Sequence, residues 1–291
     1  MGISLTAKQA AEQVKEDVRR EAERWEQAGI TPTMAVLLVE GDPASAYYAE
    51  MKRRIAFKLG VRFELSVLSQ EQAADERRLI ETIEAWNADE RIHGIMLELP
   101  LPAHLSTAAV TLAIDPRKDV DGVAPANKLA VMTGEPGLYP ATPQACIRLL
   151  QHYGYTLAGK HVVLVGRGQT VGLPLFHMLQ REQATVTVCH SRTVDLKRHV
   201  QQADIVIAAV GREGLLARDM FRSDCVIIDA GINERADGSI AGDVAPDALE
   251  AVAALSPVPG GVGTLTTAML FANVMAAVRL QQQTRQGGDA R

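Results

Sequence analysis

The sequence has few cysteines, and its histidines show no pattern of the kind that binds metal ions. Its three cysteines, Cys146, Cys189 and Cys225, are widely separated, which argues against a disulfide framework and against a thiolate zinc site. The seven histidines also lack the spacing of zinc ligands. We therefore expect no metal site.

An excess of charge of one sign and long apolar runs are also missing. The 30 basic residues nearly balance the 35 acidic ones, and no basic cluster with interleaved aromatic residues occurs, so we expect no nucleic-acid partner. The longest apolar run, "DIVIAAVG", is far shorter than the ~20 residues of a membrane-spanning helix. The first residues form a polar helical pattern rather than a signal peptide. These features predict a cytoplasmic protein without a membrane partner.

The chain does contain a hydrophobic fraction of 47%, typical of a globular protein with a sizeable core. Short apolar runs alternate with helical patterns, and this alternation predicts an α/β protein with parallel sheets. The runs are "MAVLLVE", "FELSVLS" and "IHGIMLELP" in the first half, and "HVVLVG", "ATVTVCH", "DIVIAAVG" and "DCVIIDAG" in the second. Two domains of ordinary size fit this pattern.

A segment rich in proline, glycine and aspartate separates the two halves, and we place the domain boundary after it, near Pro143. Residues 1–143 then form an N-terminal α/β domain and residues 144–263 a second domain. Residues 264–285 have the pattern of a long helix, and Gln281–Arg291 is a polar tail.

The stretch "ASAYYAEMKRRIAFKLG", residues 44–60, predicts a helix with Ser45 as its N-cap and Gly60 as its stop. At 100° per residue, four large side chains share one face: Tyr48, Met51, Ile55 and Leu59. Lys52 falls on that same face, one turn after the tyrosine. A lysine on an apolar face is a candidate functional residue.

The segment "HVVLVGRGQTVGLPLFHML" predicts a strand, a glycine turn and a helix, in that order. Gly166, Gly168 and Gly172 would allow a sharp turn, main-chain amides at a helix N-terminus and close packing of helix on strand, which together favour a pyrophosphate. The spacing is G-x-G-x-x-x-G rather than G-x-G-x-x-G. A plain strand-to-helix turn is therefore an alternative interpretation.

The next strand bears on cofactor choice. A site that prefers NAD usually has an acidic residue at the end of this strand, to bind the ribose hydroxyls. Here the strand is followed by His190, Ser191 and Arg192, and Arg167 lies in the glycine turn. A 2′-phosphate would meet donors rather than repulsion, so we expect NADP. A solvated basic loop is the alternative for Arg192.

Seven motifs carry a family resemblance that spans nearly the whole chain. The sequence resembles the methylenetetrahydrofolate dehydrogenase/cyclohydrolase family in "GDPASAYYAEMK", "GIMLELPLP", "KDVDGVAPAN", "GRGQTVGLP", "VTVCHSRT", "DAGIN" and "SPVPGGVG". The resemblance implies a homodimer of two-domain α/β subunits, in which a folate-binding N-terminal domain is completed by the C-terminal helix, residues 264–291, and residues 144–263 form a Rossmann-type NADP-binding domain. It also implies hydride transfer from a methylene-folate to NADP and, in many members, hydrolysis of the methenyl product to the formyl form.

The resemblance also implies roles for individual residues. Tyr48 and Lys52 match the family's Tyr-x-x-x-Lys, whose lysine is assigned to acid/base work in the hydrolysis. Asp121 matches the aspartate that binds the pterin ring, and Pro259, Gly260 and Gly261 match a loop beside the nicotinamide. The cofactor-binding set that it implies is Gly166, Arg167, Gly168, Thr170, Val171, Gly172, Ser191, Arg192 and Ile232. From the residues alone, an ordinary turn would also explain Asp121 or the proline-glycine loop.

One departure from the family pattern touches the chemistry, because Glu98 stands where the family has glutamine. Glu98 ends an apolar strand, and we expect it to pair with Lys52, since a lone buried carboxylate is costly. An ion pair favours the charged lysine, whereas a general base must be neutral. We therefore expect dehydrogenase activity with hydrolysis reduced or lost. In other interpretations Glu98 moves the proton itself, is protonated and imitates glutamine, or faces solvent.

The candidate catalytic residues are thus Tyr48, Lys52 and Glu98, the substrate is a reduced folate and the cofactor is NADP. Two other functions remain open from the sequence. One is a catalytically silent protein that binds folate or NADP, and the other is a dehydrogenase of the same architecture acting on another substrate.

Overall fold

The computed structural model describes residues 2–235 and 237–288, and the chain divides into two compact units. We call Val14–Tyr139 with Leu270–Arg291 the three-stranded unit, and Met1–Gln13 with Pro140–Met269 the six-stranded unit, after their main sheets. The chain passes from one unit to the other three times: within α1 (Lys8–Gln27), between Tyr139 and Pro140, and within α9 (Val262–Gly288). The two-domain α/β architecture expected from the sequence is confirmed.

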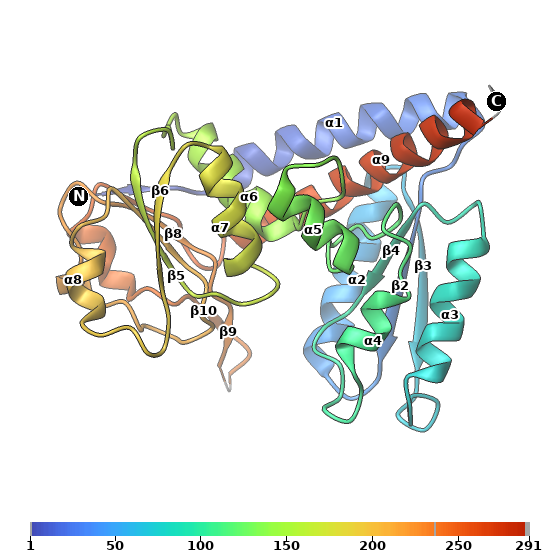
Figure 1. Ribbon diagram of the computed structural model, residues 1–291, viewed down its shortest axis with the longest axis horizontal. Helices are drawn as coiled ribbons and strands as arrows, with labels where there is room; N and C mark the ends of the chain where they lie inside the picture. Colours follow the sequence, from blue (N-terminus) through green and yellow to red (C-terminus); the bar gives the residue numbers. More distant parts are fainter. Residues whose placement is uncertain (1, 236, 289–291) are drawn as a thin grey trace. The chain divides into compact units, whose positions relative to one another are not determined.

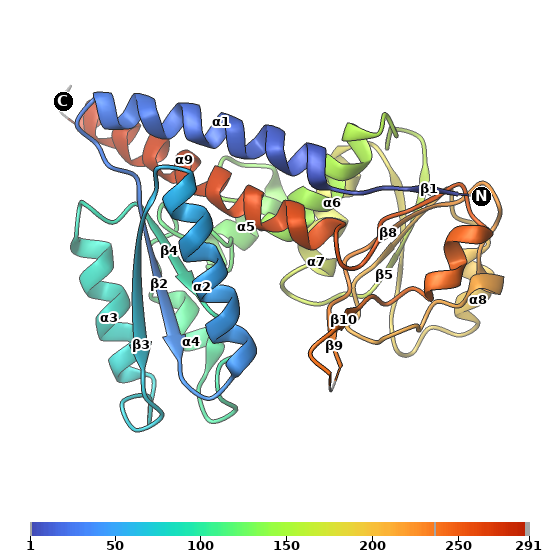
Figure 2. The same ribbon diagram turned by 180° about the vertical axis from the view of Figure 1, so that it is seen from behind.

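The three-stranded unit has a parallel sheet with the order β3-β2-β4. Its central strand is buried at every position because helices cover both of its faces. Helix α2 lies on one face, and α3 and α4 lie on the other (Figures 1 and 2). The elements are β2 (Thr33–Val39), α2 (Pro43–Lys58), β3 (Arg62–Leu68), α3 (Arg77–Ala88), β4 (Gly94–Leu97), α4 (Thr107–Leu112) and α5 (Pro125–Thr133).

Alternation along β2 builds the core on both faces of this sheet. Ala35, Leu37 and Val39 pack in one cluster with side chains of α3 and α4, among them Leu79 and Val110. The residues between them are buried as well. Because the three strands are parallel, their carboxyl ends meet at one edge of the sheet, where ligands bind in open α/β sheets.

The six-stranded unit has an all-parallel sheet with the order β1-β11-β8-β7-β5-β6. Strand β5 lies between β6 and β7, so the strand order reverses beside β5, which is the switch point of a Rossmann-type sheet. Its elements are β1 (Ile3–Ser4), α6 (Ala141–His152), β5 (His161–Val165), α7 (Gly172–Arg181), β6 (Thr185–Cys189), α8 (Leu196–Val200), β7 (Ile205–Ala208), η1 (Arg218–Met220), β8 (Val226–Asp229), β9 (Asn233–Glu234), β10 (Ile240–Ala241), η2 (Pro246–Glu250) and β11 (Ala254–Leu255).

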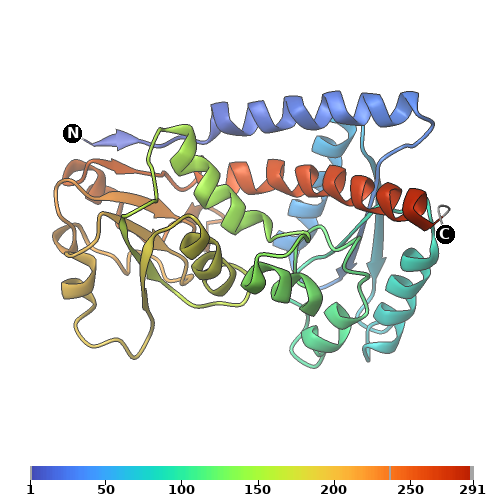
Figure 3. The ribbon, with the colours of Figure 1, turned by 45° about the horizontal axis from the view of Figure 1, so that its top comes forward.

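The predicted domain boundaries differ from the observed ones at the N-terminus. The break at Pro140 lies close to the predicted Pro143, but residues 2–13 belong to the six-stranded unit rather than to residues 14–139. The reason is strand pairing, because β1 adds a parallel edge to β11, with Ile3 opposite Ala254 (Figure 3). The main-chain N–H of Leu5 continues this ladder to the carbonyl of Leu255, at 2.9 Å.

The last helix joins the three-stranded unit from Leu270 onward, as the predicted return of the C-terminal helix requires. Phe271, Val274 and Val278 are fully buried there, and Arg279 forms an ion pair with Glu21 of α1.

The sequence interpretation overlooked the apolar character of this helix. Val262–Thr284 is long and apolar enough to cross a membrane by length and composition alone. However, 56% of its most apolar window is buried inside the fold, and a buried core helix passes the same test.

Candidate functional site

Helix α2 carries the first group of candidate residues, and its capping differs from the prediction. The predicted N-cap, Ser45, lies inside the helix, which begins at Pro43. Asp42 takes the capping role, because its Oδ2 accepts from the main-chain N–H of Ser45 at 3.2 Å and from its hydroxyl at 2.5 Å. Gly60 ends the helix as expected, with φ of +70°.

The buried stripe of α2 is also not the one predicted. The buried residues are small or follow the spacing of three and four residues: Ser45, Ala49, Ala56 and Leu59. Met51 is 39% exposed, and Tyr48 and Ile55 are half-buried. Lys52 occupies the middle position of this stripe. Its position on the inner side of α2 is therefore confirmed, but its neighbours along the stripe are alanines rather than the large side chains.

The partner of Lys52 is Glu98, which follows the last residue of β4. Lys52 Nζ donates to Glu98 Oε1 at 2.5 Å, with the two side chains 14% and 6% exposed. The main-chain N–H of Glu98 donates to Leu37 O at 2.9 Å and so holds the residue against β2. The interpretation in which Glu98 faces solvent is wrong, because its side chain is buried and pairs with Lys52 of α2.

Asp121 completes an electrostatic cluster with this ion pair. It is half-buried and follows a segment joined to β4 by a bridge between Ile95 and Asp119, so it lies at the same edge of the sheet as Glu98. Burial raises its pKa to about 7, with the negative charges of Asp119 and Glu98 adding to the effect and the Lys52 ammonium opposing it. This carboxyl can therefore exchange a proton near neutral pH.

Tyr48 lies one helical turn before Lys52. Its ring packs edge to face on that of Tyr47, with the centroids 5.8 Å apart. The lysine and the first aspartate of "KDVDG", Lys118 and Asp119, have structural roles that the sequence did not reveal.

Lys118 and Asp119 are both buried. The Lys118 ammonium caps the C-terminal end of α3. It donates to the carbonyl oxygens of Trp86, Asn87 and Asp89, at 2.9, 2.9 and 2.8 Å. The Asp119 carboxylate accepts from Val123 N, Ala124 N and Asn127 Nδ2, at 3.1, 2.8 and 2.8 Å. Both contacts fix the loop that carries Asp121.

The six-stranded unit carries the glycine turn, between β5 and α7. Gly166 has φ of +119°, and a Cβ there would lie 2.1 Å from Ala209 O. A Cβ on Gly172 would lie 2.4 Å from Gly166 O, so both positions require glycine. A Cβ on Gly168 would meet nothing within 4 Å, so that glycine is not needed for packing. The N-cap residue of α7, Val171, offers no side-chain oxygen. Leu173 N donates to Gly168 O at 2.9 Å and Pro174 has no N–H, so Gly172 N is the first-turn amide left for a ligand such as a pyrophosphate.

Beside this turn, β6 ends at the buried Cys189 and the chain reverses. The hydroxyl of Thr193 accepts from His190 N at 2.8 Å, and His190 Nδ1 accepts from Arg192 N at 3.2 Å. This tight turn leaves Ser191 and Arg192 exposed, next in the sheet to the exposed Arg167 and Thr170 of the glycine turn. The donors fit a phosphate on a ribose, and no carboxylate follows β6 within this turn.

The remaining candidates lie on loops of the same unit. Ile232 is 60% exposed after β8, and Pro259 and Gly260 are exposed after β11. Gly261 is buried, and a Cβ there would lie 2.4 Å from Pro257 O. Gly260 O accepts from Ala7 N at 2.9 Å, which ties this loop to the start of α1.

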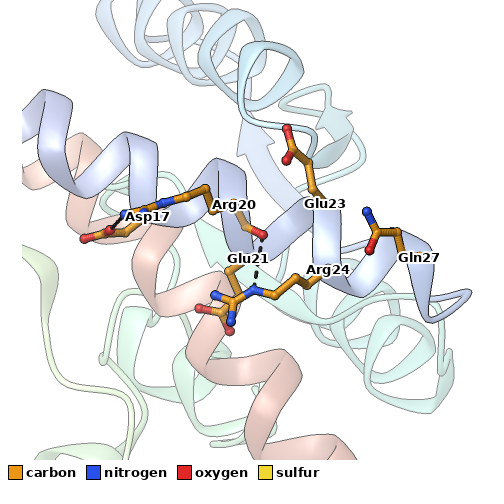
Figure 4. A pocket seen from close by; sticks show the side chains of 6 residues that line it. All are labelled: Asp17, Arg20, Glu21, Glu23, Arg24 and Gln27. Carbon is orange, nitrogen blue, oxygen red and sulfur yellow. Dashed lines mark hydrogen bonds and ion pairs between the residues drawn. The ribbon is translucent and has the colours of Figure 1, made fainter.

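None of these residues lines a shallow hollow on α1. Its lining consists of Asp17, Arg20, Glu21, Glu23, Arg24 and Gln27 (Figure 4). Arg20 pairs with Asp17, and Arg24 Nε donates to Arg20 O at 3.3 Å. This is the charged outer face of a helix and offers no catalytic group.

Comparisons with known proteins agree with the two-unit architecture. The family model "Tetrahydrofolate dehydrogenase/cyclohydrolase, catalytic domain" matches residues 5–121, and the model of the NAD(P)-binding domain of the same family matches residues 140–282. A bifunctional protein FolD 2 from Desulfitobacterium hafniense is 47% identical over 98% of this chain and 100% of its own length. A FolD from Heliobacterium modesticaldum is 50% identical over 95% of this chain and 96% of its own.

Two solved structures are similar over nearly the whole chain. The bifunctional FolD methylenetetrahydrofolate dehydrogenase/cyclohydrolase from Campylobacter jejuni has a TM-score of 0.93 at 34% identity, over 97% of this chain and 100% of that one. The Trypanosoma brucei enzyme, described as complexed with NADP cofactor and inhibitor, has a TM-score of 0.89 at 30% identity, over 96% of this chain and 98% of that one.

Proposed function

Because the chain belongs to the tetrahydrofolate dehydrogenase/cyclohydrolase family, we propose that it is an enzyme that oxidises methylenetetrahydrofolate to methenyltetrahydrofolate with NADP. The observation that carries this proposal is the largely buried Lys52 ammonium at the ligand edge of the three-stranded sheet. The same chain also contains a glycine turn of the kind that binds dinucleotides. A silent binding protein would have little use for a charge in that place, since burying an ion pair costs more than apolar packing of the same volume.

The residues of the six-stranded unit fit NADP. The tight turn that Gly166 and Gly172 permit, with the Gly172 amide at the start of α7, would hold the pyrophosphate. Arg167, Ser191 and Arg192 would hold the 2′-phosphate. When bound, the nicotinamide ring supplies the hydride acceptor. The protein's own contribution to this step is to orient the two reactants and to exclude water.

The three-stranded unit would bind the folate. Asp121 would hydrogen-bond the pterin ring, and its raised pKa allows the carboxyl to donate as well as accept there. Tyr48 and Lys52, one turn apart, would lie against the ligand from α2. The positive charge of Lys52 alone would repel the methenyl product, which is a cation. The negative charge of Glu98 neutralises that of Lys52, so the ion pair presents a nearly neutral surface to this product.

Hydrolysis of that cation needs a group that takes a proton from water. A lysine whose amine is free could do this, but Lys52 Nζ donates to the Glu98 carboxylate at 2.5 Å and is engaged in that ion pair. We therefore infer that the hydrolytic step is slow in this protein relative to the oxidation. If Glu98 instead takes the proton itself, or is protonated and imitates an amide, the hydrolytic step stays fast.

The test follows reduced cofactor and methenyl-folate together by absorbance, with purified protein, methylenetetrahydrofolate and either NADP or NAD. We expect reduction with NADP and much less with NAD, and decay of methenyl-folate close to the rate in buffer without protein. Absence of reduction with both cofactors would favour a silent binding protein or another substrate. Fast decay would contradict the inference on hydrolysis.

We also propose that the protein is a homodimer formed through β3. Among the described residues β3 pairs only with β2, so its other edge is open, and Leu65, Val67 and the neighbouring Phe57 of α2 are 37%, 43% and 87% exposed. An open apolar edge of this kind pairs with a second copy of itself about a two-fold axis. Light scattering should show a dimer that Val67→Lys weakens, whereas Leu112→Lys, at an exposed apolar position of α4, should leave it intact. A monomeric wild type contradicts the proposal.

A further inference from the structure

Two buried carboxylates of the six-stranded unit have no part in the function proposed above. Asp229 ends β8 and is 3% exposed, and Asp243 follows β10 and is fully buried. We propose that Asp243, supported by Asp229, is a positioning residue that fixes the loops holding the nicotinamide half of NADP. The proposal rests on the proposed function for the identity of the cofactor.

The Asp243 carboxylate accepts hydrogen bonds from two separate segments, the loop after β7 and the start of β9. Val210 N and Gly211 N donate to its Oδ2 at 2.7 and 3.1 Å, and Arg212 N and Asn233 Nδ2 donate to its Oδ1 at 2.7 and 3.0 Å. Three successive amides of the loop after β7 thus converge on one side chain, as they would on a bound anion. The fourth donor is the side chain of Asn233, the first residue of β9.

The Asp229 carboxylate also accepts hydrogen bonds from main-chain amides, among them that of Asp243. Its Oδ1 accepts from Gly231 N at 2.9 Å and from Asp243 N at 3.1 Å, and its Oδ2 accepts from Val244 N at 2.9 Å. Asp229 thereby fixes the main chain of Asp243 as well as the start of the loop after β8. The two carboxylates form one connected unit.

Two glycines exist in this region because the carboxylates need the space. A Cβ on Gly231 would lie 2.3 Å from Asp243 Cγ, and a Cβ on Gly242 would lie 2.0 Å from Asp229 Oδ2. Burying two negative side chains is expensive, and fully satisfied hydrogen bonding is what makes it tolerable. An arrangement this demanding at the ligand edge of the sheet points to positioning rather than to general packing.

The anchored loops occupy a defined part of the dinucleotide site. The loop after β7 touches the glycine turn, since Ala209 O is the atom that a Cβ on Gly166 would strike. It lies on the opposite side of β5 from β6, whose end carries Ser191 and Arg192. In a Rossmann-type sheet the dinucleotide crosses the switch point, so one half lies over β6 and the other over β7 and β8.

The side chains presented by these loops suit the nicotinamide half. Val210 and Ile232 are 36% and 60% exposed although their neighbouring main-chain groups are held by buried carboxylates. Two apolar side chains on a rigid main chain form a surface on which the flat face of the nicotinamide ring can rest. If the carboxylates position this surface, their loss should weaken binding of the nicotinamide half and spare the adenine half.

The experiment measures binding calorimetrically, without folate, for wild type, Asp243→Asn and the control Asp247→Asn, which makes the same change at an exposed position of η2. The amide nitrogen of Asp243→Asn would face N–H donors. We expect the Kd for NADP to rise about tenfold, as for loss of one charged hydrogen bond, while the Kd for adenosine 2′,5′-bisphosphate stays within about twofold. The control should match wild type with both ligands.

Asn233→Ala removes only one donor and keeps the test usable if Asp243→Asn does not fold; it should raise the Kd for NADP about threefold and spare the fragment. Unchanged NADP binding, or equal loss of NADP and of the fragment in a folded variant, would overturn the proposal. Wild type that binds NADP without oxidising the folate would overturn the proposed function and leave this inference standing.

Discussion

At the scale of single residues, the carboxyl of Asp121 is a group whose charge responds to pH near neutrality. Burial and the charges of Asp119 and Glu98 raise its pKa to about 7, whereas an aspartate in the unfolded chain titrates near 4. Between these values the folded protein binds the extra proton. The free energy of unfolding therefore includes a contribution from Asp121 that is complete below pH 4 and is lost as the pH rises to 7.

Asp121→Asn removes the loss of unfolding free energy that ionisation of Asp121 causes. The variant should gain stability relative to wild type as the pH rises from 4 to 7, with a constant difference above pH 7, measured by urea unfolding at a series of pH values. Asp89→Asn is the control of opposite sign, because the hydrogen bond from Arg91 lowers the pKa of Asp89 to about 2. That variant should lose stability at neutral pH and approach wild type as the pH falls toward 2. A pH-independent difference for Asp121→Asn contradicts the account.

Residue pairs were predictable where one physical rule had a single solution. Glu98 needed a cation and Lys52 was on the facing helix, so the ion pair followed from the cost of an isolated buried charge. Lys118 and Asp119 were not predictable in the same way, because their partners are main-chain groups in α3 and in the loop before α5. Main-chain acceptors and donors look alike in every sequence.

At the scale of elements, the turn between β5 and α7 gives a matched pair of substitutions. Gly166→Ala would place a Cβ 2.1 Å from Ala209 O at a positive φ, and Gly168→Ala would place one in open space. We expect the first to cost about 2 kcal/mol or more and to reduce NADP binding, and the second to change stability by less than about 0.5 kcal/mol. Thermal unfolding and NADP titration measure both. Equal effects of the two substitutions would refute the role assigned to Gly166.

Helix α2 shows why the element was predictable and its buried face was not. Its length and its stop at Gly60 follow from local chemistry. The buried stripe includes Ala49 and Ala56, because small residues let the helix approach the sheet closely, while Met51 stays exposed. A periodicity weighted by side-chain size selects the large residues and so identifies the wrong face.

At the scale of the whole molecule, both units are assembled from distant parts of the chain. Asn273 of α9 donates to Val120 O at 2.7 Å and to Tyr139 O at 2.8 Å, and Val120 directly precedes Asp121. The C-terminal helix therefore helps to fix the loop that carries the folate-binding candidate.

Asn273→Ala leaves two buried carbonyl groups without their donors, and we expect it to lower the free energy of unfolding by about 1–3 kcal/mol and to weaken folate binding. Gln283→Ala, at an exposed position of the same helix, is the control and should change neither. Chemical denaturation and folate titration make the comparison. Unchanged folate binding in Asn273→Ala would show that the loop does not depend on α9.

Strand β1 marks the limit of prediction at this scale. It is two residues long and pairs with a two-residue strand near position 254, so neither partner has a periodic pattern. Only the fold of the intervening chain brings them together, and the assignment of residues 2–13 to the six-stranded unit could not be foreseen. The sheets, the glycine turn and the ligand edges, by contrast, follow from the alternation of short apolar runs with helical patterns and from motif order.

The central claim is that the Glu98 carboxylate holds Lys52 in an ion pair and thereby slows hydrolysis of the methenyl product. The most direct measurement is the rate of methenyltetrahydrofolate hydrolysis by wild type and by Glu98→Gln, with Glu64→Gln at an exposed position of β3 as the control. The account predicts hydrolysis about tenfold or more faster in Glu98→Gln, with NADP reduction within about twofold of wild type and no change in the control, since loss of one charged contact corresponds to about that factor. Hydrolysis that stays the same or becomes slower in Glu98→Gln would contradict it.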